Sequence, residues 1–100
     1  MEINSEKKGS CLSISAKGRL DTVASREFMK WTDNNLGEDI KDVVLDCSDL
    51  TYISSSGLRV LMTIYKTITP RQGTLSLKDL TPQVGEVLNI TGMASLFNIE

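Results

Sequence analysis

Three consecutive hydroxyl side chains, Ser54, Ser55 and Ser56, are the residues of this chain best placed to carry chemistry. They lie between a short apolar run at 43–45 and a helical pattern of apolar residues that begins at Leu58, so they fall where a helix is expected to start. A helix start has backbone N–H groups without partners and the positive end of the helix dipole. It therefore suits an anion, including a phosphate carried by one of the serines.

The serines also have a purely structural interpretation. Serine is among the preferred N-cap residues, and its hydroxyl satisfies a backbone donor of the first turn. One serine is enough for a cap, so two hydroxyls of the run are not needed for capping. Gly57 has no Cβ that would obstruct this end of the helix. Two interpretations stay open: capping alone, and a serine presented to another protein and modified there.

The residue composition narrows the classes of site that the chain can build. There is no histidine, which removes Ser-His-Asp and Cys-His nucleophile systems and histidine-based metal sites. The cysteines, Cys11 and Cys47, are too few for a four-thiolate zinc site. The acidic residues of 33–49 lack the spacing of a calcium loop. We expect no metal, no cofactor and no enzyme activity, a serine hydrolase being the least favoured class.

Cysteine usage, charge and hydropathy predict the cellular compartment and limit the classes of partner. Cys11 and Cys47 lie in apolar, strand-like runs, which suits reduced core thiols of a cytoplasmic protein, although a disulfide between them stays open. The net charge of −2 favours neither nucleic acid nor an anionic membrane as a partner. No apolar run approaches the ~20 residues that span a bilayer, and the N-terminus lacks a signal-peptide core. We expect a cytoplasmic protein.

The first third of the chain predicts a hairpin followed by a helix. Residues 1–8 form a weak edge strand, and the alternation of 11–17 indicates a second strand antiparallel to it. The next five residues interrupt that alternation. Asp21 or Thr22 is expected to cap a helix over 23–36. The residues expected on its core-facing side are Ala24, Phe28 and Trp31, and the expected C-terminal stop is Gly37.

The rest of the chain alternates between strands and helices. A central strand is expected at 42–47, followed by a short crossing loop that leads to the serines. The helix after them must end before Pro70. A strand at 74–78 and a helix at 82–90, with a Thr81-Pro82 start and a Gly92 stop, complete the pattern. The apolar residues after Gly92 indicate a turn of helix and a short final strand.

This order of elements predicts an α/β fold. Strands that alternate with helices after an opening hairpin form a mixed sheet with parallel central strands and right-handed crossovers. We expect a four- to five-stranded sheet with the helices packed on it. No internal repeat or linker is present, so residues 1–100 are expected to form one domain.

The stretch 52–61, Tyr-Ile-Ser-Ser-Ser-Gly-Leu-Arg-Val-Leu, resembles the signature of STAS domains, specifically of the bacterial anti-sigma factor antagonists. Three further stretches agree, and they occur in the family's order. Residues 18–21 resemble its Gly-x-Leu-Asp turn, 43–50 its central strand and loop, and 91–97 its Thr/Ser-Gly-Leu…Leu-Phe ending. The resemblance covers essentially the whole chain and implies the STAS fold.

The resemblance also implies a partner-switching role in transcription. In such systems the unmodified antagonist binds an anti-sigma factor that is also a serine kinase, a histidine-kinase-like ATPase, and so frees the sigma factor. The kinase ends this binding by phosphorylating the antagonist, and a serine phosphatase restores it. A runner-up within the same family is a scaffold without phosphorylation, which docks a transporter subunit or a stress-sensing assembly.

The family's phosphorylated residue is the first serine of Asp-Ser-Ser-Gly-Leu, which falls on Ser55 in this chain. Ser54 stands where the family has its acidic residue, and it is the alternative acceptor. The implied contact surface for the partner is the helix start together with the neighbouring turn. Its residues are Asp21, Thr22, Ser54, Ser55, Ser56, Gly57 and Leu58.

Overall fold

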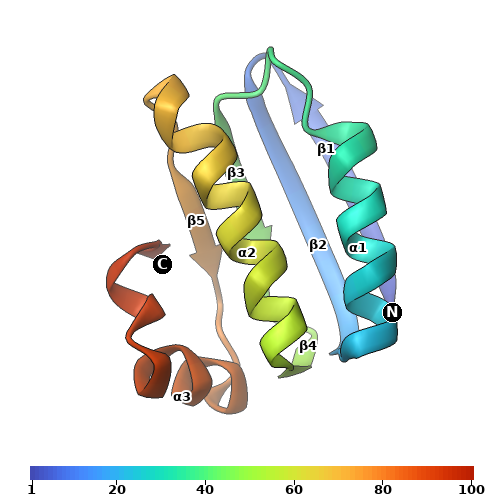
Figure 1. The fold of residues 1–100 in the computed structure, drawn as a ribbon, viewed down its shortest axis with the longest axis vertical. Coiled ribbons are helices and arrows are strands. Elements are labelled where there is room, and N and C mark those ends of the chain that lie inside the picture. Colours follow the sequence, from blue (N-terminus) through green and yellow to red (C-terminus); the bar gives the residue numbers. More distant parts are fainter.

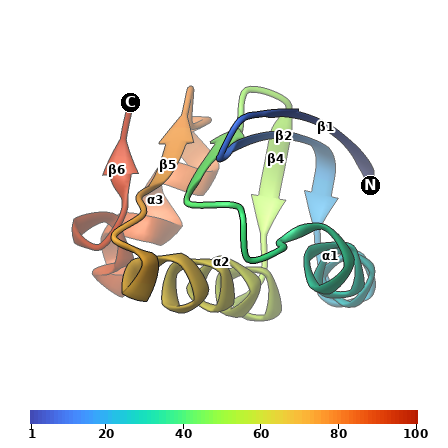
Figure 2. The same cartoon turned by 90° about the horizontal axis from the view of Figure 1, so that it is seen from above.

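In the computed structural model, which describes residues 1–100, two long helices lie on one face of a six-stranded sheet (Figures 1 and 2). The strands are β1 (Glu2–Lys8), β2 (Cys11–Leu20), β3 (Asp42–Asp46), β4 (Leu50–Ile53), β5 (Leu75–Lys78) and β6 (Asn98–Ile99). The helices are α1 (Thr22–Asn35), α2 (Ser55–Ile68) and α3 (Pro82–Thr91), with 3-10 turns at Thr69–Arg71 and Met93–Ser95.

The sheet is mixed, as the order of elements predicts. Its main path runs β1-β2-β3-β5-β6, with β4 paired to β2 beside that path. β1 is antiparallel to β2 and lies at the edge, whereas β2, β3, β5 and β6 are mutually parallel. The predicted edge hairpin, the parallel centre and the α/β class are therefore confirmed.

The expectation of four to five strands is wrong by one strand. The segment after β3 was expected to be a crossing loop, but Leu50–Ile53 forms β4, which pairs in parallel with the last residues of β2. β2 itself runs to Leu20 instead of ending at residue 17, because a register shift between Gly18 and Arg19 interrupts the alternation without ending the strand. Gly18 accommodates this irregularity with a positive φ of 109°.

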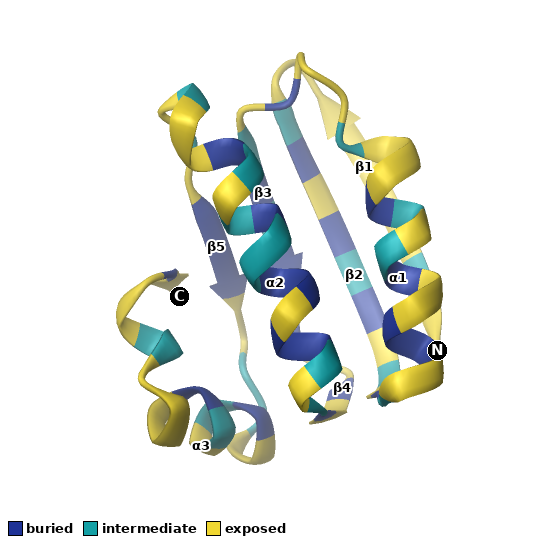
Figure 3. Ribbon diagram, in the orientation of Figure 1, coloured by how far each residue is buried: buried dark blue, intermediate teal, exposed yellow.

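The core lies between the sheet and the helices α1 and α2. Figure 3 shows buried residues along the sheet-facing sides of both helices. α2 contributes the predicted apolar stripe, and in α1 the expected core residues Ala24 and Phe28 are buried while Trp31 is half-buried. The two cysteines are free, Cys47 buried and Cys11 half-buried, so the disulfide left open by the sequence does not form.

The helix ends follow local capping chemistry at most of the predicted places. Asp21, not Thr22, caps α1, and its carboxylate accepts a hydrogen bond from the Ala24 N–H at 2.9 Å. Gly92 ends α3 in the left-handed conformation, as expected. α1 ends at Asn35 with Leu36 as C-cap, directly before the predicted stop at Gly37, although Gly37 does not adopt the left-handed conformation. No helix combines the length and apolar character needed to cross a membrane.

Candidate functional site

The starts of α1 and α2 lie side by side because the strands that lead into them are paired. β2 and β4 run parallel, and their last residues, Leu20 and Ile53, are register partners. Each chain then leaves the sheet through a capping residue, Asp21 for α1 and Ser54 for α2. Both helices consequently begin at the same end of the molecule and run next to each other over the sheet (Figures 1 and 2).

Ser54 is the N-cap of α2. Its backbone is extended, and its hydroxyl oxygen accepts a hydrogen bond from the Gly57 N–H at 3.1 Å. The same hydroxyl donates to the carbonyl oxygen of Leu20 at 2.9 Å, so both its donor and one acceptor position are in use. Ser54 therefore has the structural role that the capping interpretation assigns to one serine of the run.

Ser55 and Ser56 follow in the first turn of α2 and differ in their surroundings. Ser55 is exposed, and its hydroxyl has no hydrogen-bond partner within the protein. Ser56 is half-buried and faces the groove between the two helices. The three adjacent hydroxyls thus take three separate positions: one caps the helix, one faces solvent, and one lines the groove.

Gly57 and Leu58 were expected to lie on the contact surface, but both are buried beneath it. A Cβ on Gly57 would come within 2.8 Å of Ile53 Cγ1 and of Leu20 Cγ. The glycine is therefore required for the close packing of α2 against the ends of β2 and β4, and not for access to the helix end. Leu58 anchors the same turn in the core.

Asp21 and Thr22 form the other side of the site. The carboxylate of Asp21 is occupied by its capping bond, and the Asp21 carbonyl accepts a hydrogen bond from the Ser25 hydroxyl at 2.6 Å. Thr22 is exposed and lines the groove opposite Ser56. Of the residues predicted from the sequence, Thr22 and Ser56 line the groove and Ser55 is exposed in the first turn of α2, while Asp21 and Ser54 cap the two helices.

Two arginines in the groove were not singled out from the sequence. The groove has a volume of about 330 Å³, and Arg26 of α1 and Arg59 of α2 contribute to its walls. Arg59 could have been found from its spacing, because it lies four residues after Ser55 on the same helix. Arg26 lies outside the core-facing residues of α1, and only the packing of the two helices brings it near Arg59.

The groove offers charge and hydroxyl groups but no general base. It is lined by Thr22, Ser25, Arg26, Met29, Ser56, Arg59 and Val60. None of these side chains is a carboxylate, thiol, imidazole or amine that could activate a serine. The structure also contains no group of three or more side chains of the types that ligate metals. The arrangement suits recognition of an anion or of another protein's surface.

The titratable groups with shifted pKa values lie elsewhere. A hydrogen bond from the Ser48 backbone N–H lowers the pKa of Asp46 at the end of β3. The hydrogen bond from Lys7 lowers the pKa of Asp39, which is exposed. Burial, assisted by the charge of Asp46, raises the pKa of the Cys47 thiol to about 12. None of these groups lines the groove between α1 and α2.

Comparison with known proteins connects this arrangement to a family. The model of the STAS domain matches residues 2–100. BtrV of Bordetella bronchiseptica, a candidate anti-sigma factor antagonist, is 47% identical over 57 residues, which cover 57% of this chain and 49% of BtrV. The anti-sigma F factor antagonist of Paenibacillus polymyxa is 26% identical over 100 residues, covering 99% of this chain and 86% of that protein. The chain thus matches about half the length of the first relative.

Solved structures share the fold. SpoIIAA, an anti-sigma factor antagonist, superimposes in its unphosphorylated form with a TM-score of 0.85 at 17% identity, covering 99% of this chain and 88% of that chain. The phosphorylated form of SpoIIAA from Bacillus gives a TM-score of 0.78 at 15% identity, covering 99% and 91%. At such identities the likeness extends to the arrangement of strands and helices.

Proposed function

The chain belongs to the STAS-domain family, and from this premise we propose that it is an anti-sigma factor antagonist that phosphorylation of Ser55 switches off. Unmodified, it binds an anti-sigma factor through the surface at the starts of α1 and α2, and this binding frees a sigma factor. The same anti-sigma factor, acting as a serine kinase, transfers the γ-phosphoryl group of ATP to the Ser55 hydroxyl. A serine phosphatase hydrolyses that phosphate and restores binding.

The observation that carries this proposal is the contrast between two neighbouring serines. The Ser55 hydroxyl is exposed and has no partner, so a kinase can reach it without disturbing the fold. The Ser54 hydroxyl is committed to Gly57 and Leu20. A phosphate on Ser54 would remove the donor that bonds Leu20 and place its bulk in the capping turn. This contrast favours Ser55 over the alternative Ser54.

A phosphate on Ser55 is compatible with the folded protein. It adds roughly −1.5 to −2 charges at neutral pH. At the first turn of a helix such a charge is stabilised by ~0.3–1 kcal/mol through the dipole and the free N–H groups. The phosphorylated chain should therefore keep its structure, and the modification changes its affinity for the partner.

The charge of the Ser55 phosphate weakens binding to a partner that contacts the neutral hydroxyl of Ser55. Phosphate that becomes buried against a partner must lose its water, and each ~1.4 kcal/mol of unfavourable free energy lowers affinity tenfold. A few kcal/mol are enough to release the partner without any movement of the backbone. Relatives named as anti-sigma factor antagonists, one of them solved in unphosphorylated and phosphorylated forms, support this reading.

Phosphorylation by the anti-sigma factor is the direct test. The protein is incubated with its anti-sigma factor and ATP, and the modified residue is located by mass spectrometry. We expect label on Ser55, loss of label in Ser55→Ala, and retained label in Ser54→Asp, a variant that keeps a capping acceptor. Full labelling of Ser55→Ala would remove Ser55 from this role. Capture of a transporter subunit in place of a kinase would favour the scaffold function.

A further inference from the structure

The groove between α1 and α2 contains two guanidinium groups that form no ion pair within the protein. Arg26 and Arg59 are both exposed and contribute one guanidinium from each wall. The ion pairs of the protein join Lys7 to Asp39 and Lys8 to Glu6, so neither arginine has a carboxylate partner. The groove lining contains no acidic residue. This basic site belongs to a chain whose net charge is −2.

The helices that carry the arginines add to this local charge. α1 begins at Thr22 and α2 at Ser55, and both starts lie at the same end of the sheet as the groove. The start of α2 carries the partial positive charge of a helix dipole, whereas the Asp21 carboxylate caps the start of α1 and offsets its dipole. Over its exposed surface α2 has Arg59 and Lys66 and no acidic residue at all. Arg26, Arg59 and the start of α2 together favour an acidic group within the groove.

Two exposed apolar side chains lie on elements next to the groove but outside its lining. Val23, in the first turn of α1, is 64% exposed, and Tyr52 of β4 is 39% exposed. The Arg19 guanidinium lies over the Tyr52 ring, 4.2 Å from its centroid. Arginine and aromatic residues are enriched where proteins bind one another. Because neither Val23 nor Tyr52 lines the groove, the charges of Arg26 and Arg59 select its occupant.

We infer that this groove receives an acidic segment of the anti-sigma factor, whose carboxylates bind the guanidinium groups of Arg26 and Arg59. This inference rests on the proposed function and adds to it the chemistry by which the partner is recognised. Planar guanidinium groups pair with carboxylates through two parallel hydrogen bonds, which makes arginine the suitable residue.

The position of Arg59 also gives the phosphate a second effect. Ser55 and Arg59 are four residues apart on α2, a spacing that places side chains side by side on a helix. A phosphate on Ser55 is therefore within reach of the Arg59 guanidinium and competes with the partner's carboxylate for it. Phosphorylation thus introduces repulsion toward an acidic partner and at the same time withdraws one of the two cations that bind it.

The test compares affinities for the purified anti-sigma factor over a range of salt concentrations. Arg26→Gln and Arg59→Gln remove one charge each from the groove. The matched control is Lys66→Gln, which removes an exposed charge from α2 outside the groove lining. At low salt we expect each arginine variant to bind about tenfold more weakly, mainly through slower association, with a weaker salt dependence than the wild type. The control should change affinity less than about twofold.

The outcomes separate this inference from the proposed function. If the wild-type protein does not bind the anti-sigma factor, the proposed function fails. If it binds and both arginine variants behave like Lys66→Gln, the function stands and the acidic-segment inference is overturned. Circular dichroism of each variant checks that the fold is retained. Saturable binding of ATP or inorganic phosphate to the free protein, lost in Arg59→Gln, would contradict the inference. It would show that the ligand of the groove is a small anion and not an acidic segment.

Discussion

The Ser54 hydroxyl donates a hydrogen bond to the carbonyl oxygen of Leu20 at 2.9 Å, across 34 residues of sequence. The Ser54 N–H bonds the same carbonyl, also at 2.9 Å. One oxygen at the end of β2 thus fixes the N-cap of α2, and the next residue, Asp21, is the N-cap of α1. The relative position of the two helix starts, and hence the geometry of the groove between them, depends on this contact.

Removing the Ser54 hydroxyl should destabilise the fold more than removing its neighbour. We expect Ser54→Ala to lower the free energy of unfolding by about 0.5–2 kcal/mol, because it loses the cap and the bond to Leu20. Ser54→Asp should recover the capping part of the loss, since a carboxylate caps well and suits the helix dipole, but it cannot donate the bond to Leu20. Ser55→Ala should stay within about 0.5 kcal/mol of the wild type. Urea unfolding measures all three; equal effects of the two alanines would contradict this assignment.

Gly57 should tolerate no side chain, although it lies in a helix. A Cβ there would meet buried atoms of Leu20 and Ile53 at 2.8 Å. We expect Gly57→Ala to cost about 1–3 kcal/mol of unfolding free energy despite the better helix propensity of alanine. Gly85 of α3 is the matched control, because its Cβ would have no atom closer than Leu80 Cβ at 4.0 Å. Gly85→Ala should raise stability by up to about 1 kcal/mol. The comparison requires only thermal or urea unfolding.

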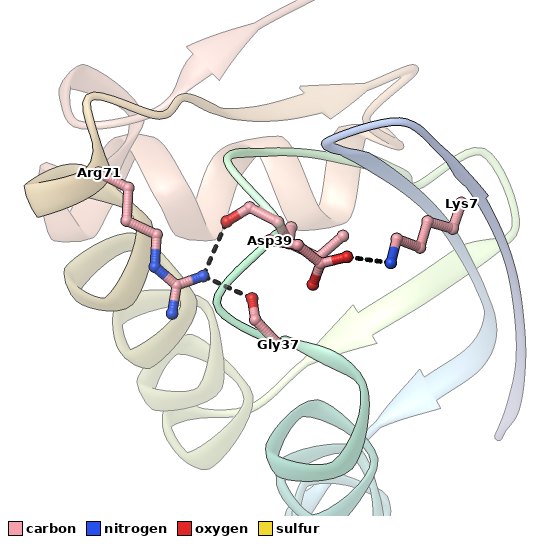
Figure 4. Close-up of polar contacts among 5 residues, drawn as sticks. Lys7, Gly37, Asp39 and Arg71 are labelled. Atoms are coloured by element: carbon pink, nitrogen blue, oxygen red, sulfur yellow. Dashed lines mark hydrogen bonds and ion pairs between the residues drawn. The ribbon is translucent and has the colours of Figure 1, made fainter.

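Arg71 should matter more for stability than the nearby ion pair. Its Nη1 donates hydrogen bonds to the carbonyl oxygens of Gly37 and Ile40, both at 2.7 Å, and so fastens the loop between α1 and β3 (Figure 4). We expect Arg71→Met to cost about 1–3 kcal/mol and to speed hydrogen exchange in that loop. Lys7→Met, which removes the exposed pair with Asp39, should leave the unfolding free energy almost unchanged. Similar losses in both variants would contradict this ranking.

The Cys47 thiol should resist modification while the protein is folded. Burial raises its pKa from 9.0 to about 12, so the reactive thiolate is scarce at mildly alkaline pH. We expect iodoacetamide to leave Cys47 unmodified in the native protein and to alkylate it in urea, as read by mass spectrometry. Because the folded state keeps a proton that the unfolded state releases above pH 9.0, stability should fall as pH rises from there toward about 12. Rapid native alkylation would contradict this burial.

Local patterns were enough to predict most elements and their ends. The apolar spacing after residue 57 predicts α2, Pro70 ends it, and Gly92 ends α3 in the left-handed conformation that glycine allows. Alternation located β5 and the part of β2 up to residue 17. These features depend on neighbours within a few residues, where backbone sterics, capping and hydrophobic period act directly.

Features that depend on distant partners were missed. β4 has only four residues, and it becomes a strand because the end of β2 supplies its hydrogen bonds. The burial of Gly57 likewise reflects Leu20, which is 37 positions away in the printed sequence.

The sequence by itself determined that a run of serines stands at the start of an amphipathic helix, because that follows from residue types and period. Only the tertiary structure decided that Ser54 caps the helix while Ser55 remains free, since the choice rests on the carbonyl of Leu20. It also brought Arg26 and Arg59 to one groove from separate helices. The physical reason is the parallel pairing of β2 with β4, which places two helix starts together and cannot be read from either segment alone.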